Sequence, residues 1–190
     1  MAHRANSRAK ESSRPERGRR PGGKPGSDPH GHGARRIGIA LITVSDTRGE
    51  TEDASGALAR RLVEAAGHEV RDYTILKDEP AAVGAKVREL AARGDVRAVI
   101  LNGGTGIARR HRTYEAVSSL LERRLDGFGE LFRALSHEEI GAAAMLSRAV
   151  AGVIGGTVVF ALPGSTAAVR LALEELILPQ LGHIIGELDK

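Results

Sequence analysis

The sequence of 190 residues contains no cysteine and no tryptophan, and only 3% of its residues are aromatic. Without cysteine, the chain has no disulfide, no thiol nucleophile and no cysteinyl zinc or iron–sulfur site. Because aromatic side chains are so few, we expect no stacking platform for single-stranded nucleic acid. No apolar run approaches the roughly 18 residues that a membrane span needs. We therefore expect a cytoplasmic protein that has no membrane partner.

Positive charge is concentrated at the start of the chain. Residues 1–34 hold eight of the 28 Lys and Arg residues but only three of the 24 acidic residues, so their net charge is +5 and that of the rest is −1. Between residues 2 and 34 there is no Val, Ile, Leu, Phe, Tyr or Trp. Such a segment cannot bury enough apolar area to offset the entropy of ordering it. We predict a disordered basic tail over residues 1–34 and one domain over residues 35–190. Any contact with nucleic acid is expected to be weak and to involve the tail alone.

The domain alternates predicted strands with predicted helices. The continuous apolar run from Ile37 to Val44 indicates a strand that is covered on both faces. Further strands are expected over residues 68–76, 96–101, 150–154 and 157–162. Helices are expected over residues 55–66, from Pro80, over 113–121, over 127–147 and from Ser165, the last of them interrupted at Pro179. This alternation predicts an α/β fold, a three-layer α/β/α sandwich with a mostly parallel sheet.

Three loops are predicted at the carboxyl edge of that sheet, where α/β proteins bind ligands. They are Ser45–Gly49, Asn102–Thr113 and Pro163–Thr166. The glycines of Gly103-Gly104-Thr105-Gly106 let backbone N–H groups approach an anion, and Pro163-Gly164-Ser165 presents further N–H groups where a helix begins. Both loops suit phosphates, although each alone is equally compatible with a tight turn.

Charged residues near the same edge have alternative interpretations. Arg109, Arg110 and Arg112 favour a polyanionic ligand or form a solvated basic turn. Mg²⁺ usually bridges phosphates with one or two carboxylates, and the candidates are Asp46, Asp53, Asp78 and Glu79. Asp78 is also placed to cap the helix that begins near Pro80, Asp53 to cap the preceding helix, and Thr113 to cap the following one.

These loops belong to a longer series of short motifs along the chain. In order they are Ser45-Asp46-Thr47-Arg48, Asp53-x-Ser55-Gly56, Asp78-Glu79, Gly103-Gly104-Thr105-Gly106, Gly127-Phe128-Gly129-Glu130, Ser136-x-x-x-Ile140-Gly141, Leu146-Ser147-Arg148-Ala149 and Leu162-Pro163-Gly164-Ser165. In this combination the sequence resembles the MoaB/MogA family of molybdenum-cofactor biosynthesis proteins, related to the gephyrin G domain, over residues 36–186. The MoaB branch is the more similar one.

The resemblance implies a molybdopterin-binding fold. In active members, MgATP adenylylates the dithiolene phosphate of molybdopterin, and pyrophosphate is released. The expected co-substrate and metal are therefore ATP and Mg²⁺, and the expected substrate is molybdopterin. Homotrimers are also implied, which MoaB-type members can pair into hexamers, and other molybdenum-cofactor biosynthesis proteins stay open as partners. Phe128 and Phe132, four residues apart on an apolar segment, could be surplus to the core and available to such an assembly.

The resemblance also assigns site residues by position. Asp78 is implied as a catalytic residue and the metal ligand, and His111 occupies the second catalytic position. Substrate or nucleotide binding is implied for Ser45, Asp46, Gly103, Gly104, Thr105, Gly106, Arg109, Arg110, Thr113, Glu130, Ser147, Arg148, Pro163, Gly164 and Ser165.

Three positions depart from the family pattern. The family has aspartate where this chain has His111, threonine where it has Asn102, and proline where it has Tyr114. A neutral imidazole is a poor Mg²⁺ ligand and an imidazolium repels the cation, so Asp46 or Glu115 could take over the metal position. Two functions stay open: a molybdopterin adenylyltransferase, or a non-catalytic molybdopterin-binding carrier or regulatory paralogue.

Overall fold

The computed structural model describes residues 36–46 and 52–190 of the chain. The predicted tail lies outside these residues. Residues 47–51, which include the second part of the predicted loop Ser45–Gly49, also lie outside them. The described strands form one six-stranded sheet in the order β2-β1-β3-β6-β5-β4. Their bounds are β1 (Gly38–Val44), β2 (Glu69–Leu76), β3 (Ala98–Asn102), β4 (Arg123–Arg124), β5 (Val150–Ile154) and β6 (Thr157–Leu162).

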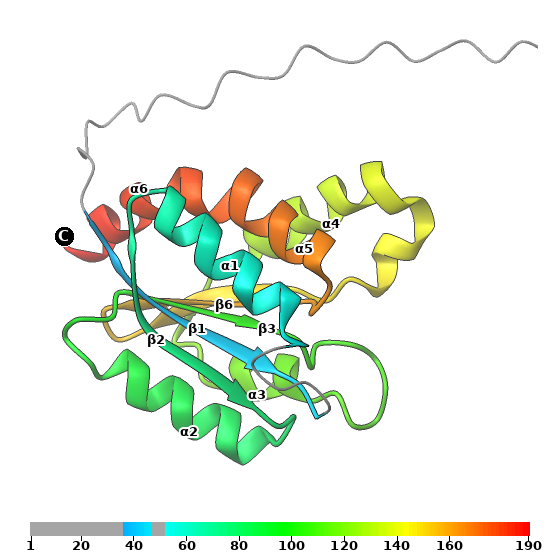
Figure 1. The fold of residues 1–190 in the computed structure, drawn as a ribbon, viewed down its shortest axis with the longest axis horizontal. Coiled ribbons are helices and arrows are strands. Elements are labelled where there is room, and N and C mark those ends of the chain that lie inside the picture. The colour runs from blue at the N-terminus through cyan, green and yellow to red at the C-terminus, as the bar shows by residue number, and fades with distance from the viewer. Residues whose placement is uncertain (1–35, 47–51) are drawn as a thin grey trace, which may run out of the picture.

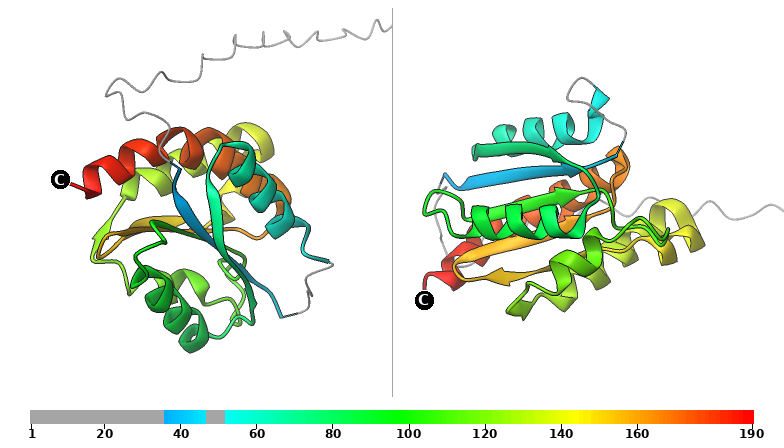
Figure 2. Two further views of the ribbon diagram at one scale, coloured as in Figure 1. Left: turned by 60° about the vertical axis from the view of Figure 1, so that its left-hand side comes forward. Right: turned by 90° about the horizontal axis from the view of Figure 1, so that it is seen from below.

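Helices cover both faces of this sheet. They are α1 (Ala54–Ala65), α2 (Pro80–Ala91), α3 (Thr113–Ser118), α4 (Asp126–Ile140), the 3₁₀ segment η2 (Gly141–Leu146), α5 (Thr166–Leu171), the π segment η3 (Ala172–Ile177) and α6 (Leu178–Leu188). In Figure 1, α1, α4, α5 and α6 lie on one side of the sheet, and α2 and α3 lie on the other. The two further views in Figure 2 show the same three layers, which confirms the predicted sandwich.

The burial of β1 explains its unbroken apolar sequence. Ile39 and Leu41 belong to the core beneath α1, α4, α5 and α6. Ala40 and Ile42, which alternate with them, belong to the core beneath α2 and α3. Because successive side chains of a strand point to opposite faces, a strand covered on both faces needs apolar residues at every position.

The sheet is parallel only in part. β2, β1, β3 and β6 pair in parallel, whereas β5 pairs antiparallel with β6 and with β4. Gly155 and Gly156 alone join β5 to β6, and Gly155 has a φ of 55°. A two-residue connection can join only antiparallel neighbours, so this edge reverses direction.

The last helix is not interrupted at Pro179, contrary to the prediction. The chain stays helical through α5, η3 and α6. Proline lacks the N–H of the helical hydrogen bond, and its ring presses on the preceding turn. The π segment lies directly before α6, where its wider turn accommodates that ring.

The two phenylalanines of α4 are part of the core and are not surplus to it. Phe132 is fully buried, and Phe128 packs edge-on against Phe160 of β6 with ring centroids 5.1 Å apart. They therefore give no support to the expected assembly. None of the helices in the described ranges combines the length and the apolarity that a bilayer crossing requires.

Candidate functional site

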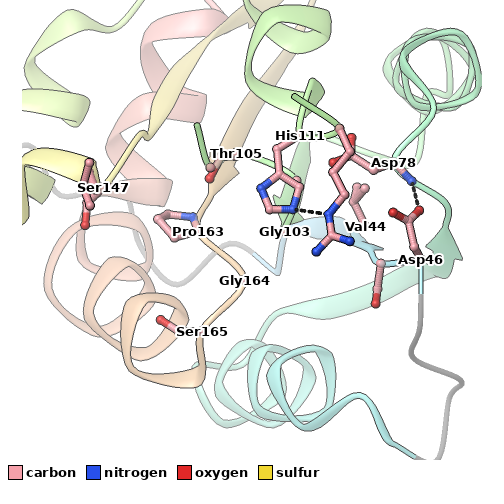
Figure 3. Close-up of a pocket in the computed structure, with 15 residues that line it drawn as sticks. Val44, Asp46, Asp78, Gly103, Thr105, His111, Ser147, Pro163, Gly164 and Ser165 are labelled. Atoms are coloured by element: carbon pink, nitrogen blue, oxygen red, sulfur yellow. Dashed lines mark hydrogen bonds between the residues drawn. The ribbon is translucent and has the colours of Figure 1, made fainter. Parts of the chain in front are cut away.

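Four strands end at the same edge of the sheet. Val44 at the end of β1 pairs with Leu76 of β2, and Asn102 at the end of β3 pairs with Leu162 of β6. The loops that follow these strands line a cleft of about 470 Å³ (Figure 3). Its lining comprises Val44, Ser45, Asp46, Asp78, Gly103, Gly104, Thr105, Gly106, Arg110, His111, Leu146, Ser147, Pro163, Gly164 and Ser165. Most of the predicted binding residues are therefore brought together.

The glycine loop begins where β3 ends and lies directly on β1. Gly103 has a φ of 100°, and a Cβ there would lie 2.2 Å from the Val44 carbonyl oxygen. Gly104 has a φ of 63°, and a Cβ there would lie 2.2 Å from Thr113 Oγ1. Only glycine combines these dihedral angles with these close contacts. The two glycines are thus required by the fold of the loop.

Three N–H groups of this loop are available to a ligand. Gly103 N donates to the Leu162 carbonyl, 3.0 Å away. The N–H groups of Gly104, Thr105 and Gly106 donate to no acceptor in the part of the chain that the structure describes. Backbone donors left unpaired by protein are satisfied by water or a ligand. Gly104, Thr105 and Gly106 all line the cleft, and an oxyanion is the complementary ligand for such donors.

The Pro163-Gly164-Ser165 loop packs against the glycine loop. A Cβ on Gly164 would lie 3.0 Å from Gly103 Cα, so the two backbones approach closely. Ser165 is the N-cap of α5, and its hydroxyl accepts a hydrogen bond from Ala168 N at 3.2 Å. Two segments about 60 residues apart in the sequence therefore form one wall, as predicted for the sheet edge.

Asp78 faces the glycine loop and does not cap α2, contrary to the capping interpretation. Its Oδ1 accepts hydrogen bonds from Thr113 Oγ1 at 3.0 Å and Arg112 N at 3.3 Å. Its own N–H donates to Asp46 Oδ1 at 3.0 Å, as Figure 3 shows. Glu79 occupies the N-cap position of α2. The predicted Thr113 cap is also wrong, because Arg112 is the N-cap of α3 and the Thr113 hydroxyl donates a hydrogen bond to Asp78 Oδ1.

The second oxygen of Asp78 suits a cation. Oδ2 is buried and has no hydrogen-bond partner among the described residues. No three His, Asp or Glu side chains in those ranges are close enough together to hold an ion by themselves. Mg²⁺ bound by one carboxylate and by ligand phosphates needs no such cluster. The donor set around Asp78 therefore fits Mg²⁺ held jointly with a phosphorylated ligand.

His111 lies half-buried in the cleft (Figure 3). Its Nε2 accepts a hydrogen bond from Arg110 Nε at 3.4 Å. Its Nδ1 is buried with no partner in the described ranges, and a Cβ on Gly106 would lie 2.6 Å from it. A nitrogen that accepts a hydrogen bond from a guanidinium is not free to bind a metal. The imidazole is thus held as part of a cationic loop.

Four residues for which the resemblance implied binding roles do not line the cleft: Arg109, Thr113, Glu130 and Arg148. Arg109 is exposed on the loop, and Glu130 lies on α4 beside a separate hollow. Arg148 is ion-paired with Glu115. This hydrogen-bonded pair holds the pKa of the Glu115 carboxyl below its ordinary value, and it engages the carboxylate that could otherwise have served as a metal ligand.

Sequence reasoning missed three contributors to the site, the first being Val44 at the end of β1, which lines the cleft. Leu146 supplies an apolar wall to the cleft, and nothing in its sequence neighbourhood marks it apart from its place before Ser147. A buried network behind the site was also missed. Asn102 Nδ2 donates to Ser55 Oγ at 3.0 Å, and Ser55 Oγ donates to Asp53 Oδ1 at 2.9 Å. Of the two interpretations of Asp53, metal ligand or helix cap, the structure shows the cap: Asp53 caps α1 and is thereby withdrawn from the cleft.

A cleft at the sheet edge, lined by two glycine-containing loops and the Asp78 carboxylate, defines an α/β domain with its candidate site at the ends of its parallel strands. Residues 40–183 match the family described as "Probable molybdopterin binding domain". The chain is 52% identical over 157 residues to molybdenum cofactor biosynthesis protein B of Halalkalibacterium halodurans, across 82% of this chain and 92% of that protein. This chain belongs to the MoaB/MogA family of molybdenum cofactor biosynthesis proteins.

Solved structures agree with this assignment. A crystal structure of a molybdenum cofactor biosynthesis protein B superposes with a TM-score of 0.81 at 50% identity, over 82% of this chain and 98% of that one. The tungsten cofactor synthesizing protein MoaB from Pyrococcus furiosus gives a TM-score of 0.75 at 39% identity, over 82% and 99%.

Proposed function

We propose that this protein binds molybdopterin and MgATP in the cleft and transfers the adenylyl group of ATP to the molybdopterin phosphate. The observation that carries the proposal is the set of three unpaired N–H groups at Gly104, Thr105 and Gly106. They are preorganised donors at an edge that also holds the buried, unpartnered oxygen of Asp78. The family's description as a molybdopterin-binding domain supports the choice of ligand.

Such a transfer depends on positioning and charge neutralisation more than on covalent help from the protein. A phosphate oxygen of molybdopterin forms a bond to the α-phosphorus of ATP, and the bond from that phosphorus to pyrophosphate breaks. The glycine loop binds and orients phosphate oxygens through its N–H groups, and Arg110 adds positive charge beside them. Asp78, with Asp46 beside it, would hold Mg²⁺, whose chemistry is to neutralise the charge that develops on the leaving group.

A second function is favoured by a specific observation. The family's second aspartate is His111 here, and its Nε2 accepts from Arg110. With one oxygen ligand replaced by an engaged imidazole, the cleft could bind molybdopterin without turning it over. The alternative is thus a non-catalytic carrier or a regulatory protein that retains the N–H donors of the glycine loop.

One experiment separates the two functions. The purified full chain is incubated with molybdopterin and MgATP, and adenylylated molybdopterin and pyrophosphate are both quantified. Formation of the two products in equal amounts supports the transferase. Saturable binding of molybdopterin with no product supports the carrier, and absence of binding rejects both.

We further propose that the protein assembles as a trimer or a pair of trimers. Large apolar side chains around the end of α4 support an assembly, because Ile140, Met145 and Leu146 are all more than half exposed. Exposed apolar groups gathered in this way are typical of interaction surfaces.

A further inference from the structure

Arg148 makes three contacts with the loop that follows β3 and with the start of α3. Its Nη1 donates to the Gly106 carbonyl at 3.4 Å, and its Nη2 is ion-paired with Glu115. The guanidinium also lies over the ring of Tyr114, 4.2 Å from the centroid, within the range of a cation–π interaction. One side chain therefore connects the middle of the glycine loop to the helix that follows it.

The outer part of the loop has few other connections. Its base is held by Gly103 N, which donates to Leu162 O, and by Thr113 N, which donates to Gly104 O, both at 3.0 Å. From Ile107 to Arg110 the residues are exposed. The backbone bond found there within the described ranges, from His111 N to Ala108 O, is internal to the loop. Within the described residues, the outer part is thus tied to the rest of the domain at its two ends, by Arg148 at Gly106 and by Asp78 at Arg112.

Tyr114, at a position where the resemblance implies proline, supplies the ring for this connection. A flat aromatic ring can support a guanidinium, whereas a pyrrolidine ring has no π face. The Tyr114 hydroxyl beside Arg124 raises the pKa of that guanidinium. The face of the ring is contacted by Arg148.

We propose that Arg148 is a positioning residue: it holds the outer part of the glycine loop, and His111 with it, in the conformation that receives phosphate. The inference rests on the proposed function for its ligand. Ser147, in extended backbone, lines the cleft, so Arg148 next to it is directed away from the ligand. Glu115 is 55% exposed, so the ion pair adds little to overall stability. The effect of losing Arg148 should therefore be local.

The test is amide hydrogen exchange of the ligand-free full chain, followed by MgATP binding. In Arg148→Met, the amides of His111 and Arg112, which donate to Ala108 O and Asp78 Oδ1, should exchange about fivefold faster, the change expected for one hydrogen bond of ordinary strength. The dissociation constant for MgATP should rise by a similar factor or more, while Tm shifts by less than about 3 °C. In Arg148→Lys, which keeps a charge beside Glu115 but loses the planar stack, exchange should be intermediate.

Arg60→Met is the matched control. Arg60 also pairs with a glutamate, Glu64, and lies 5.9 Å from the centroid of Tyr73, but it belongs to α1. This variant should leave loop exchange and MgATP affinity unchanged. Loop exchange in Arg148→Met equal to that of the wild type would overturn the inference. If the wild type binds no MgATP, the proposed function fails, and the exchange rates alone still decide the role of Arg148.

Discussion

Replacing Asp53 with alanine should destabilise the domain by more than the loss of a helix cap. Asp53 is 2% exposed. Its carboxylate accepts hydrogen bonds from Gly56 N at 2.9 Å, Ser55 Oγ at 2.9 Å and Tyr73 Oη at 2.6 Å. Loss of the cap costs about 1 kcal/mol. The substitution also takes the Asp53 acceptor away from the buried Ser55 hydroxyl and the half-buried Tyr73 hydroxyl, which adds about 1–3 kcal/mol.

The expected loss is therefore about 2–4 kcal/mol, or roughly 5–15 °C in Tm for a domain of this size. Thermal and urea unfolding of the full chain measure it. Ser165→Ala is the matched control, because Ser165 caps α5 through one exposed hydrogen bond and should cost about 1 kcal/mol. Equal destabilisation by the two substitutions would refute the view that Asp53 does more than cap.

The same carboxylate gives stability a pH dependence. Burial alone would raise the pKa of Asp53, but hydrogen bonds to its carboxylate, including those from Tyr73 and Gly56, outweigh burial and lower it. A lowered folded-state pKa means that the stabilisation is fully present above the unfolded value of about 3.9 and is lost as pH falls through the folded value. The difference in unfolding free energy between wild type and Asp53→Asn should therefore shrink below about pH 4.

Other predictions concern the cleft and the assembly. His111→Asp should raise Mg²⁺-dependent adenylylation at least about tenfold, since it adds an oxygen ligand; slower turnover than an active wild type would mean the metal is held elsewhere. Asp78→Ala should abolish whatever pyrophosphate release the wild type shows. Gly104→Ala should weaken MgATP binding, because the φ of 63° and a hydroxyl 2.2 Å from the new Cβ distort the loop, whereas Gly127→Ala, in open space, should not. Equal affinities in these two variants would contradict the loop's role. Sedimentation equilibrium should find trimers or hexamers, and only a 20.1 kDa monomer at micromolar concentration would contradict that. Deleting residues 1–34 should leave Tm within a few degrees by calorimetry, unless the tail packs on the domain.

Most of the fold could be predicted because its signals are local. The apolar run from Ile37 to Val44 indicates a covered strand by itself, and Gly67 with a φ of 82° ends α1 as expected. β4 could not be predicted. Arg123 and Arg124 form a two-residue strand that exists only because β5 offers it hydrogen bonds, and no local pattern marks it.

The site was harder to predict from the sequence, because contacts between distant segments decide whether a residue caps a helix or faces the cleft. Asp78 stands two residues before Pro80, a position compatible with a cap or a ligand. The choice is made by Thr113, 35 positions further along the chain. Motif membership also failed to distinguish Ser147 from Arg148, because neighbouring residues of an extended segment face opposite ways.

The close approach of Gly164 to Gly103 means that main chain alone forms one wall of the cleft. Substitution of surrounding side chains such as His111 and Asn102 would remove no peptide donor. Recognition of an anion and the chemistry performed on it are then separable traits that can drift independently through evolution. A scan of side-chain variants in this cleft should accordingly yield many proteins that still capture their ligand but transform it at very different speeds.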